Sequence, residues 1–123
     1  MELIVLEPQR QVIQSYGDRG FKISGLDHAG SVIVTAQKTQ SWNLASIHEI
    51  DVKEFCTKLE CLGKLNVLLL GTGNSILAPN ANLSANLQSL GISLEIMDTG
   101  AACRTFNVLV AEERRIAAVL IPT

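Results

Sequence analysis

Residues 65–73 read Leu-Asn-Val-Leu-Leu-Leu-Gly-Thr-Gly, an apolar run that ends in a glycine-rich turn. The run does not alternate apolar and polar residues, which predicts a strand covered on both faces, as in a parallel sheet. Leucines at helical spacing follow, and Gly91 ends the helix that they predict. Residues 92–97 then predict a second buried strand.

The rest of the second half continues this pattern. Asp98 or Thr99 can cap a helix with an apolar face that includes Phe106. Residues 116–121 predict a third strand, which Pro122 ends. The second half is therefore β-α-β-α-β, the pattern of an α/β layer architecture.

Upstream of this unit, the sequence predicts one more helix and a β-rich first half. Asp51 and Glu54 form a capping-box pattern at the start of the helix, and Gly63 lies where a left-handed residue would end it. Short β-branched runs at residues 21–24 and 31–35 predict two strands, and we expect the residues between them, 25–30, to form the connecting turn.

The composition limits the classes of function. Of the 123 residues, 47% are hydrophobic, enough for one core, so we expect a single domain over residues 1–123. A net charge of -2 and the lack of a Lys or Arg run argue against a nucleic-acid partner. No apolar stretch approaches the roughly 20 residues that span a bilayer, so we expect no membrane insertion.

The cysteines and the first residues indicate a compartment. Cys56, Cys61 and Cys103 are spaced for neither a zinc site nor a disulfide scaffold, which favours reduced thiols and no bound metal. Residues 1–7 hold four consecutive apolar residues flanked by glutamates, unlike a signal peptide or an Arg-rich transit peptide. We therefore expect a cytoplasmic protein of bacterial type.

Polar residues gather where the two predicted parallel strands end. If these strands are neighbours, the loops that follow them emerge at one edge, where ligands of open α/β sheets lie. The sequence thus predicts a binding crevice that includes Gly71, Thr72, Gly73, Asp98 and Thr99. The acidic residue at its mouth favours a small neutral or cationic polar ligand over a phosphate.

Two motifs in this region have other interpretations. Residues 98–101 read Asp-Thr-Gly-Ala, as in aspartic proteases, but those enzymes are all-β and here a helix follows at once. Residues 71–73 lack the third glycine of a dinucleotide fingerprint, because Ile76 occupies that position. Asp98 is therefore better explained as a helix cap, and we expect no NAD or other cofactor.

The final helix offers further candidates. Cys103 lies in its first turn beside Arg104, which could activate the thiol, but simple burial is the favoured interpretation. Thr105 and Asn107 either belong to a solvated face or point toward the crevice or a partner protein. Because no paired acid and base, metal-ligand cluster or activated nucleophile is visible, we assign no catalytic residue and favour a binding module over an enzyme.

Several of these segments together resemble one family. They are Gly71-Thr72-Gly73, Leu90-Gly91-Ile92, Met97-Asp98-Thr99, Thr105-Phe106-Asn107, Glu112, Arg114 or Arg115, and residues 118–122. This set resembles a domain-of-unknown-function family that includes assembly factor three of mitochondrial respiratory complex I and an adipogenesis-associated domain protein. The resemblance is strong in the second half of the chain and weak in the first.

The resemblance implies a three-layer α/β fold, with a central mixed β-sheet flanked by helices and an additional small β layer. It implies no cofactor and no settled enzymatic activity, and the mitochondrial members imply, by analogy, a protein partner. We therefore expect a cytosolic binding or assembly-type module. The alternatives are a small-molecule-binding protein or enzyme that uses the crevice near Thr72 and Asp98, and a redox-sensing protein that uses Cys103.

Overall fold

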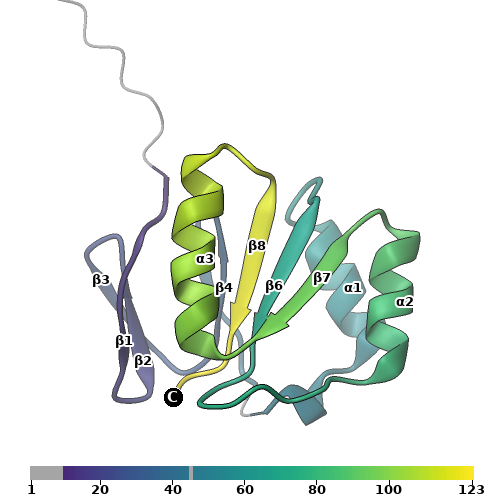
Figure 1. Cartoon of the computed structure of the whole chain (residues 1–123), viewed down its shortest axis with the longest axis horizontal. Coiled ribbons are helices and arrows are strands. Elements are labelled where there is room, and N and C mark those ends of the chain that lie inside the picture. Colours follow the sequence, from purple (N-terminus) through teal and green to yellow (C-terminus); the bar gives the residue numbers. More distant parts are fainter. Residues whose placement is uncertain (1–9, 45) are drawn as a thin grey trace, which may run out of the picture.

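The computed structural model describes residues 10–44 and 46–123 and divides their strands between two sheets (Figure 1). A central sheet has five strands in the order β5-β4-β8-β6-β7, and a small sheet has the order β1-β2-β3. The strands are β1 (Ile13–Gly17), β2 (Gly20–Ile23), β3 (Leu26–Ala29), β4 (Val32–Thr35), β5 (Thr39–Ser41), β6 (Val67–Gly71), β7 (Ser93–Met97) and β8 (Ile116–Leu120). The expectation for residues 1–7 lies outside the described residues.

The described helices are α1 (Val52–Glu60), α2 (Ala81–Ser89) and α3 (Thr99–Ala111), with a 3-10 turn at Ile47–Glu49. Asp51 caps α1 by accepting a hydrogen bond from the Glu54 N–H at 3.1 Å. Gly63, at φ +94°, and Gly91, at φ +78°, adopt the left-handed conformation just beyond α1 and α2. The predicted start of α1 and the predicted ends of both helices are therefore confirmed.

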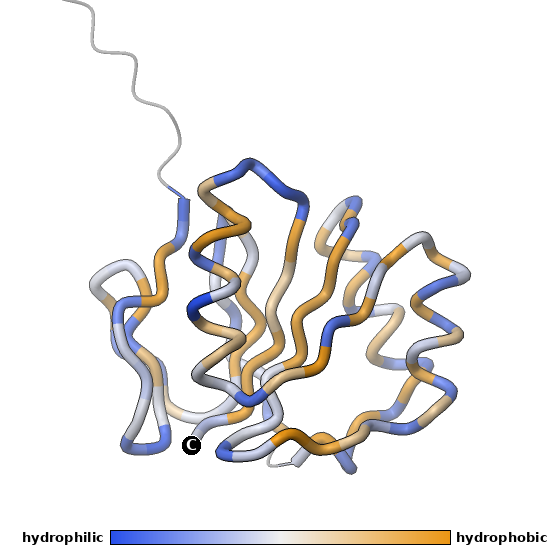
Figure 2. The backbone as a smooth tube through the Cα atoms, viewed as in Figure 1, coloured by the Kyte–Doolittle hydropathy of each residue, from blue (hydrophilic) through white to orange (hydrophobic). Residues whose placement is uncertain are grey.

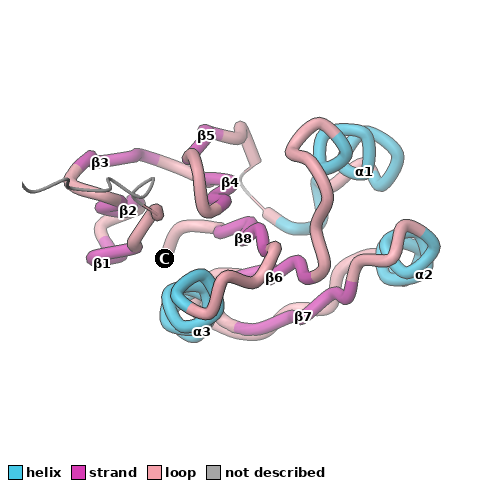
Figure 3. Tube along the Cα trace, turned by 90° about the horizontal axis from the view of Figure 1, so that it is seen from above, coloured by secondary structure: helices cyan, strands magenta, loops and turns pink. Residues whose placement is uncertain are grey.

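The central sheet is mixed, as expected. β6 pairs in parallel with both β7 and β8, while β4 pairs antiparallel with β8 and with β5. Helices α1 and α2 lie on one face of this sheet, and α3 lies on the other (Figure 3). The β-α-β-α-β unit of the second half and the α/β class are confirmed.

Each face of the central sheet has its own hydrophobic core. Leu68 and Leu70 of β6 pack in the core below α1 and α2, whereas Val67 and Leu69 pack in the core below α3. Figure 2 shows that hydrophobic residues lie along these central strands. Apolar side chains on both faces are the reason that the sequence of β6 does not alternate.

The small sheet forms the additional β layer on the α3 side. Ile13, Phe21 and Ile23 contribute to the core below α3. The Asn107 side chain of α3 joins this layer, since its Oδ1 accepts from the Ile13 N–H and its Nδ2 donates to the Ile13 carbonyl, both at 2.9 Å. The expected three-layer arrangement is confirmed.

The structure corrects two predictions. The expected turn at 25–30 contains β3, which pairs antiparallel with β2 after a two-residue turn at Ser24 and Gly25 with φ values of +49° and +84°. Strand β3 is short and largely exposed, so it lacks the apolar alternation of a strand. β7 was expected to be fully buried, but it is an edge strand, with Ser93 and Glu95 exposed.

Candidate functional site

The predicted crevice lies at the carboxyl ends of β6 and β7, which are parallel neighbours as the prediction required. The chain leaves β6 toward α2 on one face and leaves β7 toward α3 on the opposite face (Figure 3). This divergence is a topological switch point, where α/β sheets commonly bind ligands. We call Gly71, Thr72, Gly73, Asp98 and Thr99 the switch-point loops.

Thr99 connects the start of α3 to the loop after β6 and to the segment after β8. Its buried Oγ1 donates to the Ile121 carbonyl at 2.6 Å and accepts from the Gly73 N–H at 2.8 Å. Its own N–H donates to the Gly73 carbonyl at 2.9 Å. Both hydrogen-bonding functions of the hydroxyl are therefore used within the protein.

Thr72 closes the loop that follows β6. Its Oγ1 donates to the Ser75 carbonyl at 2.6 Å and accepts from the Leu77 N–H at 3.1 Å, and the side chain is 4% exposed. Its N–H donates to the Met97 carbonyl at 3.0 Å. The hydroxyl therefore organises the turn, a role that its place after a buried strand did not reveal.

Gly71 has no space for a side chain. A Cβ at this position would lie 3.0 Å from the Thr99 Cα and 3.1 Å from the Ala102 Cβ. The glycine thus permits α3 to pack closely against the end of β6.

Asp98 caps α3, because one carboxylate oxygen accepts from the Ala101 N–H at 2.8 Å. The cap interpretation of Asp98 is confirmed. The structure therefore brings five of the predicted site residues together, and the side chains of Thr72, Asp98 and Thr99 all bond to backbone groups of the same protein.

The other two predicted site residues do not share one surface. Asn107 contacts β1 through both amide atoms, as described above. Thr105 is half-buried and lies two residues earlier, about 200° away around the helix. Asn107 thus points toward the small sheet rather than toward the switch-point loops.

The structure does not support a reactive thiol at Cys103. The side chain is buried in the core below α3. Burial raises the pKa of the Cys103 thiol to about 12, and the smaller effect of Arg104 in the opposite direction does not offset it. At neutral pH the thiol is protonated, so it is a packing residue, as the sequence favoured. Among residues 10–44 and 46–123, no group of three or more His, Cys, Asp or Glu side chains could hold a metal ion.

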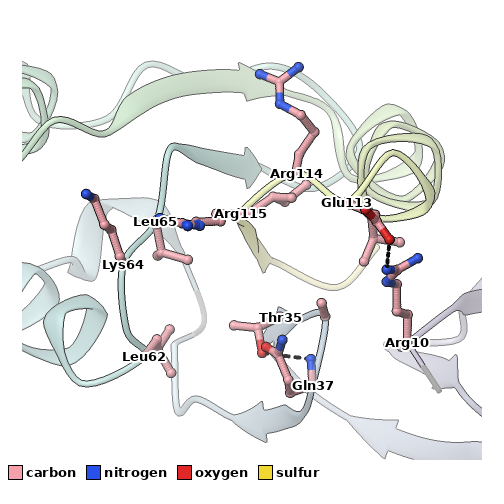
Figure 4. Close-up of a pocket in the computed structure, with 12 residues that line it drawn as sticks. Arg10, Thr35, Gln37, Leu62, Lys64, Leu65, Glu113, Arg114 and Arg115 are labelled. Carbon is pink, nitrogen blue, oxygen red and sulfur yellow. Dashed lines mark hydrogen bonds and ion pairs between the residues drawn. The ribbon is translucent and has the colours of Figure 1, made fainter. Parts of the chain in front are cut away.

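A second candidate site, which sequence reasoning missed, lies at the opposite end of the central sheet. Here β6 and β8 begin and β4 ends, around a cavity of about 480 Å³ (Figure 4). We call this cavity the basic hollow, because its charged side chains are Arg10, Lys64, Glu113, Arg114 and Arg115. Its buried apolar lining includes Leu65, Val110 and Ile116.

One sequence signal could have indicated the basic hollow. Residues 112–115 read Glu-Glu-Arg-Arg immediately before β8 and form the hydrophilic connection from α3 to β8 in Figure 2. The sequence also allows a local charge pair between Glu112 and Arg115. The structure instead pairs Glu113 with Arg10 at 2.6 Å, across 103 positions of sequence.

A larger hollow of about 670 Å³ opens beside Trp42, where the segments before β4, after β5 and after β8 meet. Trp42 is half-buried and stacks on Phe55 with ring centroids 4.9 Å apart. Arg19 is the charged side chain in the lining, so the basic hollow has the stronger electrostatic character. None of the described helices has the length and apolar content needed to cross a membrane.

Comparison with known proteins places this architecture. Residues 13–121 match the model of a protein family of unknown function, DUF498/DUF598. The chain is 38% identical over 111 residues to NADH dehydrogenase (ubiquinone) 1 alpha subcomplex assembly factor 3 of Danio rerio, covering 90% of this chain and 64% of that protein. It therefore spans a little less than two thirds of that relative.

Two further relatives match over most of their own length. An uncharacterised protein of Rhodobacter capsulatus is 32% identical over 114 residues, covering 89% of this chain and 83% of that protein. A crystal structure described as an outer membrane protein of Bartonella henselae superposes with a TM-score of 0.82 at 36% identity, covering 94% of this chain and 97% of that one. The sequence match and the shared fold agree, and the chain belongs to the DUF498/DUF598 family.

Proposed function

We propose that this protein is an assembly-type module that binds other proteins, and that its partners are subunits of a respiratory NADH dehydrogenase. The observation that carries the proposal is the 38% identity, over 90% of this chain, to a protein named for the assembly of that enzyme. This chain spans 64% of that relative. The partners of the whole relative are therefore assigned to this chain as part of the proposal.

The geometry of the switch-point loops gives no support to catalysis there. Thr72 and Thr99 bond to backbone groups of the protein itself, and Asp98 caps a helix. A catalytic site needs an acid, base or nucleophile directed at a substrate. Cys103, the cysteine of α3, is a buried neutral thiol.

The proposal includes a location in the cytosol. Cys56, Cys61 and Cys103 are all free, which fits a compartment that keeps thiols reduced.

Complementation tests this function directly. Cells that lack assembly factor 3 would express this chain behind a mitochondrial leader, and native gels would measure the assembled NADH dehydrogenase. We expect partial restoration and co-purification of NADH dehydrogenase subunits with the tagged chain. An imported, folded chain that restores no enzyme and captures no subunit would contradict the proposal. The leader fused to an unrelated domain of similar size is the control.

A small polar ligand at the switch-point loops is the second candidate function, and the divergence of the chain after β6 and β7 favours it. Its site would be the switch-point loops. A thermal-shift screen of neutral and cationic polar compounds tests it. A genuine hit should be lost in Asp98→Asn but kept in Asp51→Asn, since both variants keep a capping oxygen and change charge at equivalent helix starts. Compounds that bind both variants equally would argue against this site.

A further inference from the structure

The basic hollow differs in charge from the rest of the molecule. Its lining contains four cations and one carboxylate, in a chain with a net charge of -2. The carboxylate of Glu113 is already paired with Arg10 at 2.6 Å. Within the described part of the chain, the three remaining cations, Lys64, Arg114 and Arg115, have no ion-pair partner. The local excess of positive charge is therefore uncompensated there.

The cations surround an apolar floor. Three buried apolar residues of the lining, Leu65, Val110 and Ile116, form what we call the apolar floor. In Figure 4, Lys64 and Arg115 lie beside Leu65 on one side, and the Arg10–Glu113 pair lies on the other. Arg114 extends away from Leu65 and Thr35. This pattern of an apolar centre with a charged rim is typical of protein interfaces.

The hollow is poorly suited to a small isolated anion. The cationic side chains are all exposed and are spread around the rim rather than directed at one point. Thr35, the buried hydroxyl in the lining, is used in its own turn, where it donates to the Lys38 carbonyl at 3.3 Å and accepts from the Lys38 N–H at 3.3 Å. Among the described residues, no buried side-chain donor is left without a partner to fix an oxyanion. Several separated carboxylates could instead each meet one cation.

The chain builds this hollow from distant segments. Arg10 precedes β1, Lys64 precedes β6, and residues 113–115 join α3 to β8. Glu113 adopts φ +63°, and the Arg114 N–H then donates to the Leu109 carbonyl at 3.1 Å, which closes the end of α3. This tight ending sends the two arginines directly to the start of β8.

We propose that the basic hollow is the docking site for an acidic segment of the protein partner, with at least one apolar residue that contacts Leu65, Val110 and Ile116. The proposal rests on the assembly-type function above and specifies how that partner is recognised. Charge complementarity carries it: the three cations that have no ion-pair partner among the described residues select carboxylates, and the apolar floor selects against a purely polar segment. Because the net charge of the whole chain is negative, the attraction for carboxylates comes from the hollow and not from the molecule as a whole.

A direct binding experiment uses a labelled peptide that alternates glutamate and leucine, and fluorescence anisotropy as the readout. The test variant combines Lys64→Glu, Arg114→Glu and Arg115→Glu. The matched control combines Lys22→Glu, Lys53→Glu and Lys58→Glu, which changes net charge equally outside the hollow. We expect the hollow variant to lose about tenfold or more in affinity, and the control variant to lose much less. Circular dichroism melts would verify that both variants fold.

Two further probes identify the occupant. Methyl NMR of the wild-type protein with the peptide should shift Leu65, Val110 and Ile116, and replacing the peptide leucines with serine should weaken binding. Inorganic phosphate alone should neither displace the peptide nor reproduce these shifts. Displacement of the peptide by millimolar phosphate would overturn the proposal in favour of a small-anion site. Equal losses of peptide affinity in the hollow and control variants would overturn it in favour of non-specific charge attraction.

The complementation assay separates this inference from the proposed function. If the wild-type chain and the hollow variant both restore the NADH dehydrogenase, the function stands and the docking site is wrong. If the wild-type chain restores it and the hollow variant alone fails, both are supported. If the wild-type chain fails to restore it, the proposed function is wrong, and the peptide experiment still decides whether the hollow binds acidic segments.

Discussion

The two ends of the central sheet use polar residues in opposite ways. At the switch-point loops, Thr72, Asp98 and Thr99 direct their side chains to backbone groups of the protein itself. At the basic hollow, Lys64, Arg114 and Arg115 have no ion-pair partner within the described residues. The conventional ligand end is closed by hydrogen bonds, and the other end is open and charged. Position at the carboxyl ends of the strands is therefore not by itself evidence of side chains that are free to bind a ligand.

The largest expected effect is a difference in the rates at which two cysteines react with a thiol reagent. Cys61 is exposed on the segment that leads to the hollow, whereas Cys103 is buried one turn after Thr99. A rise in the pKa of Cys103 from 9.0 to about 12 reduces its thiolate fraction about a thousandfold. With Ellman's reagent at pH 8, Cys103 should react at least that much more slowly than the same thiol in urea. A Cys61→Ser variant assigns the fast phase, and rapid labelling of Cys103 in the folded protein would break the contrast.

The same shift sets a direction for alkaline stability. The folded-state pKa of Cys103 is raised, so the protonated thiol favours folding and this contribution is complete below pH 9. It is lost as pH rises from 9 to about 12, since the unfolded thiol ionises first. Urea midpoints should therefore fall less steeply over this range for Cys103→Ala than for the wild-type protein. Parallel pH curves for the two proteins would contradict the assignment.

Thr99→Val should produce the largest loss of stability among the polar substitutions. It keeps the approximate shape of the side chain but leaves the Gly73 N–H and the Ile121 carbonyl without their hydroxyl partner in a buried site. We expect a loss of about 2–4 kcal/mol in the free energy of unfolding, measured by urea titration. Thr105→Val, on the same helix but half-buried, is the control and should change stability by less than about 0.5 kcal/mol. Similar effects for the two would refute a special role for Thr99.

Asp98→Ala should have an intermediate effect. The substitution removes the cap that accepts from the Ala101 N–H, and caps of this kind typically contribute about 1 kcal/mol. Asp98→Asn retains an acceptor and should recover most of the loss in a thermal melt. If alanine and asparagine were equally stable, the capping explanation would fail.

The smallest effect is expected at the hollow. Lys64→Gln and Arg115→Gln remove exposed charges that have no ion-pair partner among the described residues, so each should change the free energy of unfolding by less than about 0.5 kcal/mol. Urea titrations of both variants against wild type measure this. A loss of unfolding free energy as large as that of Thr99→Val would mean that these residues stabilise the fold rather than remain available to a partner.

Local sequence patterns predicted the parts of the fold that depend on local physics. Asp51, Asp98 and Gly91 mark helix boundaries because capping and left-handed residues act within one turn. The adjacency of β6 and β7 followed from two apolar runs joined through a helix. The edge position of β7 could not be seen, since its composition resembles that of a buried strand.

The candidate sites were harder to predict because they depend on tertiary contacts. Thr72 and Thr99 looked like ligand donors until their backbone partners were known. The basic hollow combines residues 10, 64 and 113–115, which no local pattern connects. Strand β3 was missed for a different reason: it is exposed and polar, and its pairing with β2 supplies the order that its own sequence does not indicate.

The position of β8 has a consequence for how the protein is made. This strand follows all the other described strands in sequence, yet it lies between β4 and β6 and pairs with both. During synthesis, the hairpin β4–β5 and the pair β6–β7 leave the ribosome before the strand that joins them. A nascent chain that stops short of residue 116 therefore exposes two unpaired sheet edges, which are sites of aggregation and of chaperone binding. The central sheet can therefore form all of its strand pairs only after residues 116–120 have emerged.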